Sequence, residues 1–288
     1  MNLVINEEEK SKKIKERIKK YHNGIWFLMI FLIPLGFFLY LSRYVGYGSF
    51  QLSVNVNYSN DTQYANISWN YLLQIIFLGP ILGVIFYILM KKLLSKVDIN
   101  ERKNQIMIFA IEIGVVVLII LNCMGHFSHL GFEIVNAIDS THGIALNSEY
   151  KEMFIYAWFM DEWFGHTLIH ITYFGYLIIA LVAEQLLDEE KPIMIDELVL
   201  IIFFSLGYSV IDGYAAIQGE SGFILLLLHL IATIVTITFI AFKKVNPLKY
   251  PLLLTLLIST IFVVLYNLYW IIKFGINPLY PFYSGNLS

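Results

Sequence analysis

The chain has 288 residues, enough for two soluble domains, but 58% of them are hydrophobic and only 14% are charged. A mean hydropathy of +0.69 is typical of an integral membrane protein. The net charge of -3, without a basic face interleaved with aromatic residues, excludes the common nucleic-acid-binding classes. Cys123 is the single cysteine, so we expect any transition metal to be bound through nitrogen and oxygen ligands.

We predict an all-α, polytopic integral membrane protein, a bundle of about seven transmembrane helices. Its spans are the segments long and apolar enough to cross about 30 Å of hydrocarbon, and they lie at 24–42, 71–91, 106–128, 153–184, 197–217, 222–242 and 250–273. The transmembrane domain is therefore expected over residues 24–273, with an outer loop at 43–70. Within this loop the alternating residues of 51–70 favour a short hairpin.

The charge distribution predicts a cytoplasmic N-terminus. Sixteen of the 19 Lys and Arg residues fall in segments on one side of the predicted spans, 1–23, 91–104, 186–196 and 243–249. All four Asn-x-Ser/Thr sequons fall on the other side, beginning at Asn57, Asn60, Asn66 and Asn286. We therefore expect residues 1–23 to be a cytoplasmic basic segment and residues 274–288 an outer C-terminal tail. The expected location is the plasma membrane or an endomembrane.

The fourth span carries two acids and two histidines within residues 161–170. A charged side chain at the centre of a bilayer costs at least about 2.5 kcal/mol, so such residues are functional candidates. At about 100° per residue, Glu162, His166 and His170 share one face of a straight α-helix, and Asp161 points about 140° away from His166. We predict His166 and His170 as metal ligands from adjacent turns, Glu162 as a ligand or catalytic base, and Asp161 as a catalytic acid or the partner of an imidazole N–H.

The third span ends in a second polar set, His126, His129 and Glu133, spaced at i, i+3 and i+7. We predict that all three are metal ligands that face the fourth span. If the helix ends near Ser128, the alternative is a pair of interfacial histidines followed by a solvated loop acid.

The fifth span carries Asp212 within a stretch of small residues. Asp212 either completes the site as a catalytic acid or pairs with a nearby tyrosine. His229, alone on a leucine-rich face of the sixth span, is expected to be a satisfied structural histidine. Because the third to fifth spans bring their acids and histidines to the same predicted outer end, we expect one shared site that faces the non-cytoplasmic side.

The residue types favour a membrane-embedded, metal-dependent enzyme, most readily a hydrolase. Three or four imidazoles with a carboxylate suit a divalent metal, zinc more than iron, and zinc activates a bound water. The expected partners are membrane lipids and a lipid or amphiphilic small-molecule substrate. The alternatives are a proton- or metal-ion-coupled transporter or channel that uses the same cluster, and a haem protein with His129 and His166 as axial ligands.

A metal-free lipid isomerase is a further alternative. His129-x3-Glu133, the acids of the next span and Gly207-Tyr-Ser-Val-Ile-Asp212-Gly-Tyr follow an order that resembles the emopamil-binding sterol isomerase family. The resemblance covers about three of the seven spans and implies proton shuttling by His129, Glu133 and Glu162 in a lipid-facing cavity. It gives no role to His126, His166 and His170, and we do not assign the chain to this family.

Overall fold

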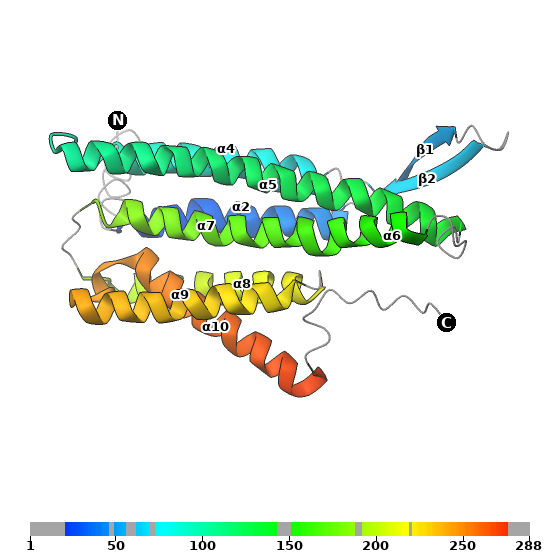
Figure 1. Ribbon diagram of the computed structural model, residues 1–288. Helices are drawn as coiled ribbons and strands as arrows, with labels where there is room; N and C mark the ends of the chain where they lie inside the picture. The colour runs from blue at the N-terminus through cyan, green and yellow to red at the C-terminus, as the bar shows by residue number, and fades with distance from the viewer. Residues whose placement is uncertain are drawn as a thin grey trace, which may run out of the picture.

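The computed structural model describes residues 21–45, 49–55, 62–68, 73–142, 151–187, 192–218 and 221–275. The basic segment 1–20, the sequons at Asn57, Asn60 and Asn286, and the tail 276–288 lie outside these residues. The described chain is α-helical apart from one hairpin, and its helices form a bundle of seven members (Figure 1). The predicted all-α class is therefore confirmed.

The bundle comprises, in chain order, α2 (Asn23–Val45), η1 and α4 (Gln74–Ile81, Leu82–Leu94), α5 (Arg102–His142), α6, η3 and α7 (Lys151–Trp158, Phe159–Gly165, His166–Glu184), α8 (Ile195–Gln218), α9 (Gly222–Lys243) and α10 (Pro251–Phe274). The short η4 (Pro247–Lys249) leads into α10. The strands β1 (Ser49–Asn55) and β2 (Thr62–Ser68) pair antiparallel, with Ser49 opposite Ser68. This pairing confirms the predicted hairpin.

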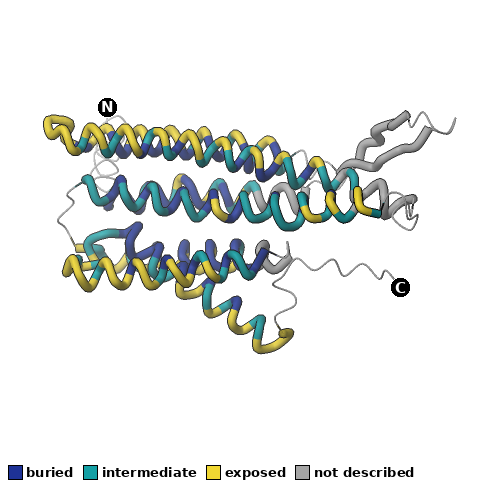
Figure 2. Tube along the Cα trace, in the orientation of Figure 1, coloured by how far each residue is buried: buried dark blue, intermediate teal, exposed yellow. Residues whose placement is uncertain are grey.

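Five of the described helices are long and apolar enough to cross a membrane: Gln74–Leu94, Arg102–Glu133, Lys151–Glu184, Gly222–Lys243 and Pro251–Phe274. The outer faces of α5 and α9 are widely exposed (Figure 2). On α5 these exposed side chains are apolar, among them Ile113, Val116 and Ile120. Apolar faces of this extent are typical of proteins that contact lipid. The structure therefore indicates a multi-pass membrane protein, whereas the orientation stays a prediction.

The helix α5 runs for 41 residues, well past its predicted end. The expectation that it stops near Ser128 is wrong, because the fall in hydropathy there marks the end of the apolar stretch and not of the hydrogen-bonded helix. His129 and Glu133 therefore lie on a continuous helix and not in a loop. Helical geometry fixes them about one turn apart on the same face.

Aromatic side chains from three helices fill the centre of the bundle. Phe31 of α2, Phe86 of α4 and Tyr176 of α7 are each at most 1% exposed. The Phe86 and Tyr176 ring centroids lie 4.1 Å apart, and Phe31 meets both rings edge-on at about 5.5 Å. This packing holds α7, the helix that carries His166 and His170, against α2 and α4.

A buried carboxylate joins α7 to α10. Pro251, the first residue of α10, has no backbone N–H to donate. The Glu184 carboxylate accepts hydrogen bonds from the next two backbone N–H groups, those of Leu252 at 3.0 Å and Leu253 at 3.3 Å. The last residue of α7 therefore caps the beginning of α10.

A second buried carboxylate joins the start of α8 to the chain just before α2. Glu197 accepts from the His22 backbone N–H at 2.7 Å and contacts the His22 ring Nδ1 at 2.8 Å. It also accepts from the Met194 backbone N–H at 2.9 Å. Both Glu197 and His22 are fully buried. These contacts tie the helix ends together at the end of the bundle opposite the candidate site.

Candidate metal centre

Two glycines let α5 approach the fourth predicted span at the candidate site. A Cβ atom at Gly125 of α5 would lie 3.1 Å from the Ile169 backbone nitrogen of α7. A Cβ atom at Gly165 of η3 would lie 3.0 Å from the backbone nitrogen of His129. Small residues at helix contacts allow backbones to come this close. The polar residues around Gly125 and Gly165 are consequently brought together.

The segment η3 (Phe159–Gly165) is a π-helical turn inside the predicted fourth span. Its hydrogen bonds join residues five apart, so one turn holds one residue more than an α-helical turn. Asp161 and His166, five residues apart, therefore both lie against His129. The prediction that Asp161 points away from His166 is wrong, because it assumed an uninterrupted α-helix.

The π turn is stabilised from α5. The Ser128 hydroxyl donates a hydrogen bond to the Met160 carbonyl oxygen at 3.0 Å. Irregular helical turns inside apolar spans depend on such side chains to satisfy backbone groups.

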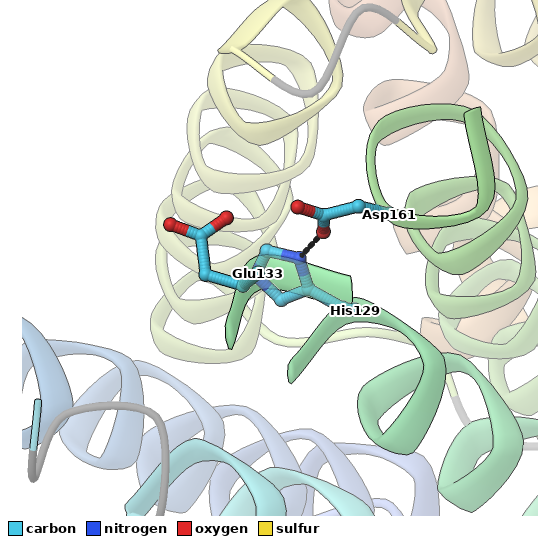
Figure 3. Close-up of side chains that lie close together, drawn as sticks. All are labelled: His129, Glu133 and Asp161. Atoms are coloured by element: carbon cyan, nitrogen blue, oxygen red, sulfur yellow. Dashed lines mark hydrogen bonds and ion pairs between the residues drawn. The ribbon is translucent and has the colours of Figure 1, made fainter. Parts of the chain in front are cut away.

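His129, Glu133 and Asp161 form a group that can hold a metal ion. One potential ligand atom from each residue lies within 4.8 Å of the other two. Figure 3 shows the Glu133 and Asp161 carboxylates beside the His129 ring, with Glu133 and His129 on one helix and Asp161 on the next. Asp161 is fully buried, whereas His129 is 17% exposed. The group is therefore closed at Asp161 and partly accessible at His129.

His129 and Asp161 also contact each other directly. The His129 Nδ1 and Asp161 Oδ1 atoms are 2.5 Å apart, which is a hydrogen-bond contact. A metal ligated by both of these atoms would displace the proton between them. If His129 binds through its other ring nitrogen, Asp161 instead orients the ring, as carboxylates do behind many metal-bound histidines.

His166 lies beside this metal group but outside it. Its ring centroid is 4.4 Å from that of His129. Its Nδ1 atom is 3.0 Å from the Glu162 carbonyl oxygen and 3.3 Å from the Glu162 carboxylate. The predicted pairing of Glu162 and His166 across one helical turn is present, and both side chains are partly exposed.

His126 also lies outside the metal group. It is 3% exposed, and its Nε2 atom is 3.1 Å from the Tyr173 hydroxyl. One turn earlier on α5, the Asn122 side-chain amide donates to the Leu78 and Gly79 carbonyl oxygens of η1. His126 therefore contacts α7 and supplies no atom to the group of His129, Glu133 and Asp161.

His170 and Asp212 belong to a different group. The His170 Nδ1 atom lies 2.6 Å from Asp212 Oδ1, and the His229 Nε2 atom lies 3.2 Å from Asp212 Oδ2. The expectation that His229 is isolated is wrong, because the leucine-rich pattern of α9 shows its apolar neighbours in sequence and not the carboxylate on α8. The single predicted cluster is thus divided into a metal group and a His170–Asp212–His229 group. Asp212 therefore contacts two histidines outside the metal group, and its predicted role as a catalytic acid stays a prediction.

The chain was compared with models of protein families, with curated proteins and with solved structures, and none of the three comparisons found a match. We therefore infer the function from the geometry of these two groups.

Proposed function

We propose that the protein is a membrane-embedded, metal-dependent hydrolase that binds its metal through His129, Glu133 and Asp161. The observation that carries this proposal is the convergence of their ligand atoms within 4.8 Å, from two neighbouring helices in apolar spans. Three such groups in lipid are costly unless they serve a purpose. The adjacent His166 ring would add a second imidazole, and two imidazoles with a carboxylate are the ligands of common catalytic zinc sites.

A divalent metal held by these residues would supply an activated water for the hydrolysis of an ester or amide. Zinc lowers the pKa of a bound water to about 7, so that hydroxide is available at neutral pH. Glu162, partly exposed and next in sequence to Asp161, is the proposed base that accepts the proton of this water. The site lies on apolar helices long enough to cross a membrane, which favours a lipid or another amphiphile as the substrate. In the orientation predicted from charge, the site lies in the non-cytoplasmic leaflet.

The first test is elemental analysis of protein purified in detergent with a trace of zinc. We expect about one zinc per chain in the wild type, and loss of zinc in Glu133→Gln and Asp161→Asn. Glu112→Gln is the matched control, because Glu112 lies on the same helix and pairs with Lys91 at the surface. Wild-type protein without bound metal, or equal metal in all four proteins, would refute the metal site.

The second test is catalytic. Purified protein is incubated with mixed micelles that contain synthetic ester-linked and amide-linked lipids, and released fatty acid is measured. We expect release by the wild type, a decrease of at least about 100-fold in Glu162→Gln, consistent with the usual contribution of a general base, and retention of metal by that variant. Bound metal without hydrolysis, together with ion flux in proteoliposomes, would instead support the transporter alternative.

A further inference from the structure

The His170–Asp212–His229 group joins three helices, α7, α8 and α9. The exposed fractions of the three residues are 4%, 3% and 0%. Asp212 contacts a different imidazole through each of its two oxygens, at 2.6 Å and 3.2 Å. The group is therefore a chain of imidazole, carboxylate and imidazole in the interior of the bundle.

The buried Asp212 carboxylate requires a proton in this group to balance its negative charge. The helices α7 and α8 contain no Lys or Arg, and the cation of α9 is Lys243, in its last turn. The rings of Phe174 and Tyr208 lie beside His229, with centroids 5.1 Å and 6.4 Å away, and supply no positive charge. Because an unpaired buried carboxylate is strongly unfavourable, the positive charge must come from a proton held between Asp212 and its histidines.

At each end of the group, one ring nitrogen has no hydrogen-bond partner among the described residues. The His170 Nε2 and His229 Nδ1 atoms are buried and have no hydrogen-bond partner among the described residues. Since each ring uses its other nitrogen to contact Asp212, these two nitrogen atoms are the opposite ends of the His170–Asp212–His229 group. A structural network that only joins helices would be expected to satisfy such atoms.

We propose that the His170–Asp212–His229 group is a proton relay that connects α7 with α9. In the resting state His170 donates from Nδ1 to Asp212 Oδ1, and the proton on Asp212 Oδ2 is donated to His229 Nε2. A proton that arrives at His170 Nε2 moves the Nδ1 proton to Oδ1 and the Oδ2 proton to Nε2, and the Nδ1 proton of His229 leaves. One proton enters and one leaves, so the group stays neutral and no bond between heavy atoms changes.

One end of the relay lies close to the metal group. His170 follows His166 by one helical turn, about 6 Å along the axis, and the His166 ring lies beside that of His129. The α7 end of the relay therefore lies next to the helical turn that borders the metal group. The relay does not depend on metal binding, because its three residues lie outside the metal group.

Histidine ring nitrogen NMR tests the relay directly. Protein labelled with ¹⁵N in its seven histidines is purified in detergent, and the signals of His170 and His229 are assigned from His170→Gln and His229→Gln. A relay must interconvert the two tautomers of each ring, so we expect exchange-averaged nitrogen shifts for both residues in the wild type. In Asp212→Asn the amide keeps the hydrogen bonds but does not pass a proton on, and each ring should show one fixed tautomer.

One variant and one reference signal serve as controls. Asp161→Asn changes the metal group and should leave the averaged signals of His170 and His229 intact. The His22 signals report on folding, because His22 is fixed by Glu197 far along α8 from Asp212. Fixed tautomers for both rings in the wild type, across the pH range in which histidine titrates, would overturn the proposal without reference to any variant. Exchange that persists in Asp212→Asn would overturn it as well.

Discussion

Gly165→Ala should disturb the contact on which the metal group depends. The added methyl group would lie 3.0 Å from the His129 backbone nitrogen, 3.2 Å from its Cα atom and 3.3 Å from the Gly125 carbonyl oxygen. These are backbone atoms of α5, so no side-chain rotation relieves the contact. The helix α5 must retreat by a few tenths of an ångström, and His129 moves away from Asp161 with it.

The expected magnitude follows from two opposing effects. Replacing a helical glycine by alanine stabilises a helix by up to about 1 kcal/mol. Overpacking a tight contact costs about 1–3 kcal/mol. Gly131→Ala provides the first effect without the second, because Gly131 lies on α5 and a Cβ atom there meets nothing within 4 Å. We therefore expect Gly165→Ala to be less stable than Gly131→Ala by about 1–3 kcal/mol.

Reversible unfolding in mixed micelles, followed by circular dichroism, measures this difference, and zinc titration of the same proteins measures the site. Gly165→Ala should bind zinc more weakly, whereas Gly131→Ala should bind it as the wild type does. If the two variants are equally stable and bind zinc equally, the close approach of α5 and η3 does not hold the site together.

Three further changes test other contacts. Glu184→Ala removes the cap of α10 and should destabilise the protein by about 1–3 kcal/mol. Glu184→Gln should destabilise it less, because one acceptor remains. Thermal unfolding measures both variants, and an equal loss of stability in the two would contradict the capping role. Asn122→Asp should destabilise more than Asn122→Ala, since it turns an anion toward two carbonyl oxygens; pulse proteolysis compares them, and the reverse order would refute this contact. Zinc affinity should rise with pH, because the proton between His129 and Asp161 competes with the metal; calorimetry that finds no proton release would argue against ligation by both residues.

Apolar length and periodicity were sufficient to predict much of the fold from the sequence. The segments predicted at 71–91, 222–242 and 250–273 agree closely with helices that are long and apolar enough to cross a membrane. The end of α5 was not predictable in this way, because polar residues such as His129 and Glu133 continue a helix as readily as they end one. Hydropathy locates the bilayer, whereas backbone hydrogen bonds determine where a helix ends.

The sequence predicted which residues take part in the candidate site, but only partly which of them lie together. The contact between His129 and Asp161 follows from the predicted neighbourhood of α5 and the next span, and that between Glu162 and His166 follows from their i, i+4 spacing. The separation of His170 from the metal group depends on α8 and α9, whose position a single sequence does not give. His229 could have been suspected on one ground, since a histidine in an apolar span generally needs a polar partner.

The length of η3 has a consequence for how this site tolerates change. Deleting Phe159 or Met160 and returning the segment to ordinary α-helical hydrogen bonding would leave Asp161 and His166 five residues apart on an α-helix, about 140° from each other around its axis. Asp161 and His166 would then no longer both lie against His129, although no functional side chain had been replaced. In η3, the number of residues is therefore as important for the site as the side chains that they carry.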